Sequence, residues 1–159
     1  MVNKDQDRAI ISFFQAVAEL QKTGVSRSSR YLGDIGEFLC SQAFAGFELT
    51  PHLREPGHDA VLGDKTVQVK FHNSPTRNNI DVGNPEKYDL LFVVIGPESR
   101  LKEASHLPIE FRIYTYSRKK ILSWVREGKT YYCAKGTLKA ADSVKIVAMS
   151  TGLIFGQKV

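Results

Sequence analysis

The chain has little of what would make it a thiol-based metalloprotein or a membrane protein. It has two cysteines, Cys40 and Cys133, which lie far apart and form no Cys-x-x-Cys pair, so a zinc site or redox motif is not expected. The longest apolar run, residues 90–95, is far short of the roughly 20 residues that span a bilayer. Charged residues precede the first apolar stretch, unlike a secretory signal. These absences predict a cytoplasmic protein without a membrane partner.

What the chain does have is an ordinary globular composition with a basic excess. Of its 159 residues, 42% are hydrophobic and 25% are charged, which is typical of one folded domain. Lys and Arg number 22 against 17 Asp and Glu, so the formal charge is +5. A basic surface favours polyanions. We therefore expect a single domain over residues 1–159 with nucleic acid among its candidate partners.

Helical spacing of apolar residues predicts two helices at the start of the chain. Residues 5–23 form an amphipathic pattern, which we interpret as an extension of a core covering about residues 30–150. A second helix is expected soon after residue 30, and one side of it carries Gly33, Gly36 and Glu37. The two glycines would let this helix approach a sheet closely, with Glu37 beside them.

A period of two then predicts a hairpin whose strands are residues 59–62 and 65–71, joined by a two-residue turn. Pairing across that turn sets Asp59 opposite Gln68, and Lys70 follows two residues later on the same face. The alternate positions form an apolar core face: Ala60, Leu62, Val67, Val69 and Phe71. The hairpin therefore predicts one polar face that presents Asp59, Gln68 and Lys70 together.

The rest of the chain reads as further strands with one more helix. We expect a long polar loop over residues 73–88, a buried strand over 90–95, a strand over 111–116, a helix over 117–125 and final strands over 131–134 and 144–149. The aromatic residues expected in the core are Phe13, Phe14, Trp124, Tyr131 and Tyr132. This order of elements predicts an α/β fold with a central mixed β-sheet.

The polar hairpin face has the chemistry of a metal site. Asp59 offers a carboxylate and Gln68 a neutral carbonyl oxygen, both suited to Mg²⁺. Lys70 could hold the attacking water and offset phosphate charge, while the metal lowers the pKa of that water. Glu37 is the best candidate for a second carboxylate. The alternative is that the hairpin presents only a solvated polar face.

Three short strings carry a family resemblance: Gly36-Glu37-Phe38-Leu39, then Gly57-His58-Asp59-Ala60, then Val67-Gln68-Val69-Lys70. Together they resemble the PD-(D/E)XK restriction-endonuclease-like superfamily over roughly residues 31–95. Gln68 stands where most members have an acidic residue, as in the QxK variant of the Mrr-like branch.

The resemblance implies a three-layer α/β/α fold around the mixed sheet. It also implies a Mg²⁺-dependent DNA endonuclease, with Mn²⁺ as a substitute, that leaves 5′-phosphates in a restriction, defence or DNA-processing role. Glu37, Asp59 and Gln68 would bind the metal, and Lys70 would complete the catalytic set. Cutting both strands takes two active sites, so a homodimer is expected. The alternatives are a nucleic-acid-binding protein that has lost cleavage, with Gln68 marking the loss, and an interaction module with the same fold.

Duplex DNA would be held by basic and amide side chains. Those near helix starts favour phosphates, and those in the polar loop favour base edges. The predicted contacts are Arg27, Arg30, His72, Arg77, Asn78, Asn79, Arg118, Lys119 and Lys120. For each of them the alternative is a solubilising charge.

Overall fold

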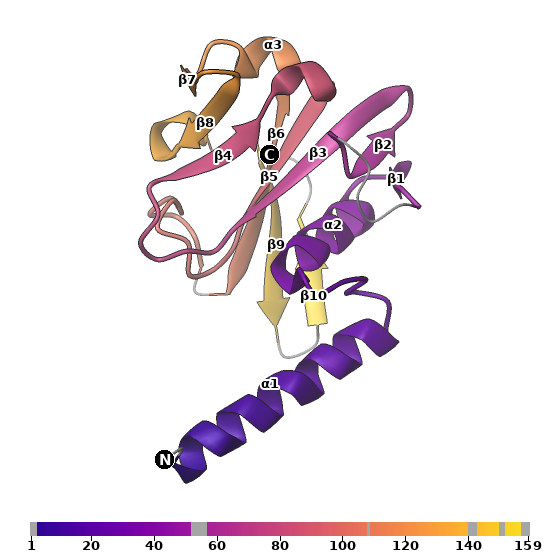
Figure 1. The fold of residues 1–159 in the computed structure, drawn as a ribbon, viewed down its shortest axis with the longest axis vertical. Helices are drawn as coiled ribbons and strands as arrows, with labels where there is room; N and C mark the ends of the chain where they lie inside the picture. Colours follow the sequence, from indigo (N-terminus) through magenta and orange to yellow (C-terminus); the bar gives the residue numbers. More distant parts are fainter. Residues whose placement is uncertain (1–2, 52–56, 108, 140–142, 150–151, 157–159) are drawn as a thin grey trace.

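The computed structural model is a mixed α/β fold built on one large and one small sheet (Figure 1). It describes residues 3–51, 57–107, 109–139, 143–149 and 152–156. The helices there are α1 (Lys4–Lys22), α2 (Tyr31–Ala43) and the short α3 (Arg118–Ile121). None of them is long and apolar enough to cross a membrane.

The large sheet consists of β1 (Phe47–Leu49), β2 (Ala60–Leu62), β3 (Lys65–His72), β5 (Leu90–Ile95), β6 (Glu110–Ser117), β9 (Ser143–Met149) and β10 (Gly152–Phe155). They are ordered β1-β2-β3-β5-β6-β9-β10, and β3 and β5 are parallel whereas the other pairs are antiparallel. The small sheet is ordered β4-β8-β7 and consists of β4 (Asn79–Gly83), β7 (Val125–Glu127) and β8 (Thr130–Ala134). The predicted α/β class and mixed sheet are confirmed.

The hairpin register is the one that the sequence predicts. Ala60 pairs with Val67 and Leu62 with Lys65, and Gly63 adopts a φ of 63° in the turn between them. That conformation favours glycine, which has no Cβ to clash with the backbone. β3 is longer than β2, so beyond Val67 the edge of β3 is no longer paired with β2.

Helix α2 covers one face of the large sheet and makes the first core. The apolar face of the hairpin packs there, as predicted, with Val67 and Val69 buried against Leu39 and Cys40 of α2. Helix α2 can lie close because Gly36 has no side chain: a Cβ at that position would come within 3.0 Å of the Phe71 ring.

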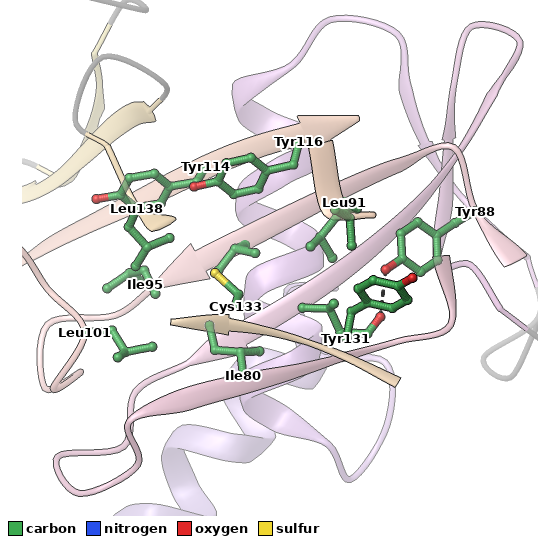
Figure 2. Packing of buried hydrophobic residues seen from close by; sticks show 13 residues of the cluster. Ile80, Tyr88, Leu91, Ile95, Leu101, Tyr114, Tyr116, Tyr131, Cys133 and Leu138 are labelled. Carbon is green, nitrogen blue, oxygen red and sulfur yellow. Dashed lines mark hydrogen bonds between the residues drawn. The ribbon is translucent and has the colours of Figure 1, made fainter. Parts of the chain in front are cut away.

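The small sheet covers the other face and makes the second core (Figure 2). Ile80 of β4 and Cys133 of β8 point toward Leu91 and Ile95 of β5. The expectation of a second helical layer is therefore corrected: this layer is mainly a three-stranded sheet, with α3 beside it. The polar loop expected over residues 73–88 in fact contains β4 and a 3-10 helix, Pro85–Lys87.

Two further predictions need correction. The helix expected over residues 117–125 extends only over Arg118–Ile121. Helix α1 starts with the Asn3 side chain accepting hydrogen bonds from the Asp5 and Gln6 N–H groups, and it then extends away from the sheets (Figure 1). Its Phe13 and Phe14 are 50% and 60% exposed, so the prediction that they are core residues is wrong.

Candidate functional site

Asp59 and Gln68 meet at the edge of β3, beyond its last pair with β2 and just before the chain enters β2. Oδ2 of Asp59 accepts a hydrogen bond from the Val69 N–H at 2.8 Å and another from Nε2 of Gln68. The Asp59 N–H in turn donates to the Val67 carbonyl at 2.8 Å. The side chain of Asp59 is thus fixed by main-chain groups of the neighbouring strand, and the predicted juxtaposition with Gln68 is confirmed.

Burial and the neighbouring positive charges have opposite effects on the pKa of Asp59. Burial raises the pKa of the Asp59 carboxyl, while the Val69 N–H and the positive charges of Lys70 and Arg30 act in the opposite direction. Burial prevails, so the pKa of Asp59 stays above its ordinary value. Lys70 is half-buried and close enough to act on this carboxylate. Three of the four predicted catalytic side chains therefore belong to one electrostatic cluster.

The cluster lies around an edge rather than on a single face. Pairing of β3 with β5 matches Gln68 with Leu91 and Lys70 with Val93, so both side chains belong to the face covered by the small sheet. Glu37 comes from α2, on the opposite face. Asp59 at the β3 edge links the two sides: burial is the main cause that raises the pKa of Glu37, and the charge of Asp59 raises it further.

Glu37 is buried and paired with a cation. Its Oε2 lies 2.5 Å from Nη2 of Arg27, whose Nη1 donates to the Thr50 carbonyl at 3.1 Å. Burial raises the pKa of Glu37, and the hydrogen bond from Arg27 only partly offsets this. Arg27 was expected to bind phosphate, and nothing in the sequence indicates its pairing with Glu37.

A polar loop before α2 sets the position of Arg27. Asp34, in the first turn of α2, accepts hydrogen bonds from the Ser26 hydroxyl and from the N–H groups of Arg27 and Ser28. Although burial opposes it, this set of donors lowers the pKa of Asp34. The signal in the sequence is Ser-Arg-Ser followed by an Asp in the first turn of a helix, a pattern of local capping.

The donors at the site match a hard divalent cation in type. Among described residues, neither Oδ1 of Asp59 nor Oε1 of Gln68 accepts a hydrogen bond, so both oxygens remain for a ligand. Mg²⁺ prefers carboxylate and carbonyl oxygens of this kind. No group of three or more His, Cys, Asp and Glu side chains lies together in the described part of the chain. The described residues therefore fit a Mg²⁺ site that has few anionic ligands.

The predicted nucleic-acid contacts fall into three groups. Six are exposed: Arg30, Arg77, Asn78, Asn79, Lys119 and Lys120. Two are engaged within the protein, Arg27 with Glu37 and Arg118 with Asp89 at 2.8 Å. His72 is buried, with Nδ1 2.7 Å from the Ser99 hydroxyl, and its pKa is lowered by burial. The structure therefore does not present His72 to a phosphate at the surface.

No known family model matches the chain, and no curated protein matches it as a relative.

Proposed function

We propose that the chain is a Mg²⁺-dependent nuclease that hydrolyses phosphodiester bonds of DNA at the edge of β3. The observation that supports this most is the contact between Asp59 and Gln68, with Lys70 acting electrostatically on the same carboxylate. An acidic group, an amide oxygen and a cation are the groups that metal-assisted phosphate chemistry uses. Arg30, which is exposed and whose charge acts on Asp59, would add affinity for the phosphate backbone.

Each residue of the site has a distinct role in this proposal. Asp59 and Gln68, with Glu37 behind them, would hold the cation, which when bound lowers the pKa of water and offsets charge on the phosphate. The Val69 N–H holds Asp59 in place by fixing Oδ2, which would leave Oδ1 as the oxygen that binds the cation. Lys70 would donate to a phosphate oxygen or position the attacking water.

A second candidate function is nucleic-acid binding without cleavage. The observation that favours it is the ion pair of Glu37 with Arg27, which engages one of the only two carboxylates in the proposed site. Gln68 adds no negative charge. A site with a single available carboxylate binds Mg²⁺ weakly, so such a protein would keep its affinity for DNA and lose the reaction.

A plasmid assay with a matched pair of variants tests the proposal. Supercoiled DNA is incubated with the wild-type protein, with Asp59→Asn and with Asp64→Asn, each with Mg²⁺ and with EDTA. Asp64 lies exposed in the hairpin turn, so Asp64→Asn removes the same charge at a position away from the site. Nicking by wild type and Asp64→Asn alone, abolished by EDTA, supports the nuclease. Intact plasmid with a salt-sensitive gel shift supports the second candidate.

A further inference from the structure

The outer face of the small sheet is a surface that neither core uses. Tyr131 and Cys133 of β8 point into the second core, so Tyr132 and Ala134 point the other way. Register places Asn79 of β4 beside Ala134 and Val125 of β7 beside Tyr132. An amide, a phenol and an aliphatic side chain therefore share one outward face.

This face is hollowed. The hollow has a volume of about 790 Å³, and it is formed by the outward residues of the sheet with the segment that leads into β7. It lies within the range of small-molecule sites, roughly 300–1,000 Å³. Its lining includes Asn79, Trp124, Arg126, Glu127 and Tyr132.

Trp124 gives the hollow a fixed aromatic wall. Its ring packs edge-on against Tyr116, with ring centroids 4.9 Å apart, and it contacts the second core. The indole Nε1 is covered and has no hydrogen-bond acceptor among the described residues. The expectation that both Trp124 and Tyr132 are core residues is partly correct for Trp124, which packs against the second core and lines the hollow. It is wrong for Tyr132, which points away from that core and lines the hollow.

We propose that this hollow binds an unpaired nucleobase of the DNA that the protein acts on, which rests on the proposed function. Aromatic side chains stack on bases. The Asn79 carboxamide offers a donor and an acceptor side by side, the pattern that reads base edges. The Glu127 carboxylate can accept from an exocyclic amino group, and the charge of Arg126, which lines the same hollow, offsets that of Glu127.

The residues just before Asn79 are suited to bind the phosphate backbone of the DNA strand whose base enters the hollow. Arg77 and Asn78 are exposed and directly precede Asn79, so phosphates flanking the base would lie against them. Residue 79 follows Lys70 by nine residues, on the next strand along the chain. The hollow therefore extends the predicted base-contacting loop into a pocket with a stacking surface.

Because Trp124 is the only tryptophan, its fluorescence reports on the hollow without any cleavage. A single-stranded 12-nucleotide oligodeoxycytidine is titrated in EDTA, alongside an abasic strand of the same length. We expect saturable quenching by the first, with at least 10-fold weaker binding of the abasic strand. Tyr132→Leu should weaken binding about 5- to 100-fold, the range of a lost stacking contact. Asn79→Ala should weaken it by a similar factor, about 5- to 100-fold, as for a lost contact to a base edge. Gln42→Ala, an exposed amide on α2, should leave binding unchanged.

The two proposals fail separately. Equal affinity for the abasic strand, or unchanged binding by both hollow variants, overturns the nucleobase site whatever the cleavage result. Absence of quenching in a protein that nicks plasmid overturns the hollow and leaves the nuclease standing. Quenching that depends on Tyr132 in a protein that cuts nothing supports the hollow and contradicts the nuclease. Circular dichroism of each variant verifies that it is folded.

Discussion

Arg27 and Glu37 form a salt bridge of 2.5 Å between the loop before α2 and the inner side of that helix. The Glu37 carboxylate is buried beside Asp59, whose charge acts against its ionisation. A buried carboxylate needs a counter-charge or a proton. Arg27 is therefore the counter-charge that stabilises the Glu37 carboxylate beside Asp59.

Removing Arg27 should destabilise the protein in a pH-dependent way. We expect Arg27→Ala to lower the free energy of unfolding by about 1.5–3 kcal/mol at pH 7, the usual cost of losing a hydrogen bond to a charged group. The pKa of Glu37 is already raised and would rise further. A carboxyl whose pKa is higher in the folded state loses stabilisation as pH rises through the interval between the two values. The loss of unfolding free energy caused by Arg27→Ala should therefore be smaller at pH 4 than at pH 7.

Urea denaturation at pH 4 and pH 7 measures this effect. Glu37→Gln in the Arg27→Ala background is the control, because it removes the buried charge and should recover part of the loss. A deficit that is the same at both pH values and is not relieved by Glu37→Gln would contradict the assigned role of Arg27.

Gly36 and Gly33 make a matched pair on α2. A Cβ on Gly36 would meet the Phe71 ring at 3.0 Å and the Phe71 Cβ at 3.3 Å, whereas a Cβ on Gly33 would find only the Arg30 Cβ at 4.0 Å. Gly36→Ala should destabilise by about 1–3 kcal/mol through overpacking. Gly33→Ala should be neutral or stabilise by up to about 1 kcal/mol through helix propensity. If the two substitutions change the melting temperature equally, Gly36 is not the position at which α2 packs closely against Phe71.

Gln68 tests whether the site is built around a cation. In Gln68→Glu, the donor that contacts Asp59 becomes a second carboxylate. Like charges raise each other's pKa, so the metal-free variant should lose stability as pH rises, and Mg²⁺ should restore it. Cleavage by this variant should need less Mg²⁺ than cleavage by wild type. Melting at pH 5 and pH 8, with and without Mg²⁺, shows the effect.

Gln68→Ala is the control for that experiment, because it loses the donor without adding a ligand. Its melting temperature should be lower than that of the wild-type protein, and Mg²⁺ should not raise it. If Mg²⁺ stabilises Gln68→Glu no more than Gln68→Ala, the paired side chains do not form a cation site.

The hairpin could be predicted because its information is local. A two-residue turn and strict alternation fix the register, and a slip of one residue would turn Val67 and Val69 to the wrong face. The Arg27–Glu37 pair could not be predicted in this way. It depends on the loop conformation that Asp34 sets, and nothing in residue spacing reveals that conformation.

Of the small sheet, the strand β8 was predicted as residues 131–134, but β4 and β7 were missed, for a related reason. β4 has only two buried apolar residues, Ile80 and Val82, among polar ones, which is too short a pattern to distinguish from a loop. Its partner β8 begins at Thr130, so the pairing that stabilises it is far away in sequence. Because this layer was not predicted as a sheet, Trp124 and Tyr132 were expected to lie only in the core.

The most direct test of the nuclease proposal is single-turnover cleavage of an end-labelled DNA duplex by Lys70→Ala and Lys65→Ala. Both lysines lie on β3, but Lys65 is exposed at the turn and away from Asp59. We predict that Lys70→Ala lowers the Mg²⁺-dependent rate by at least about 100-fold, as for loss of a general acid–base or charge-stabilising group. Lys65→Ala should cleave at the wild-type rate. Equal rates for the two variants, or cleavage that persists in EDTA, would contradict an active site at Asp59, Gln68 and Lys70.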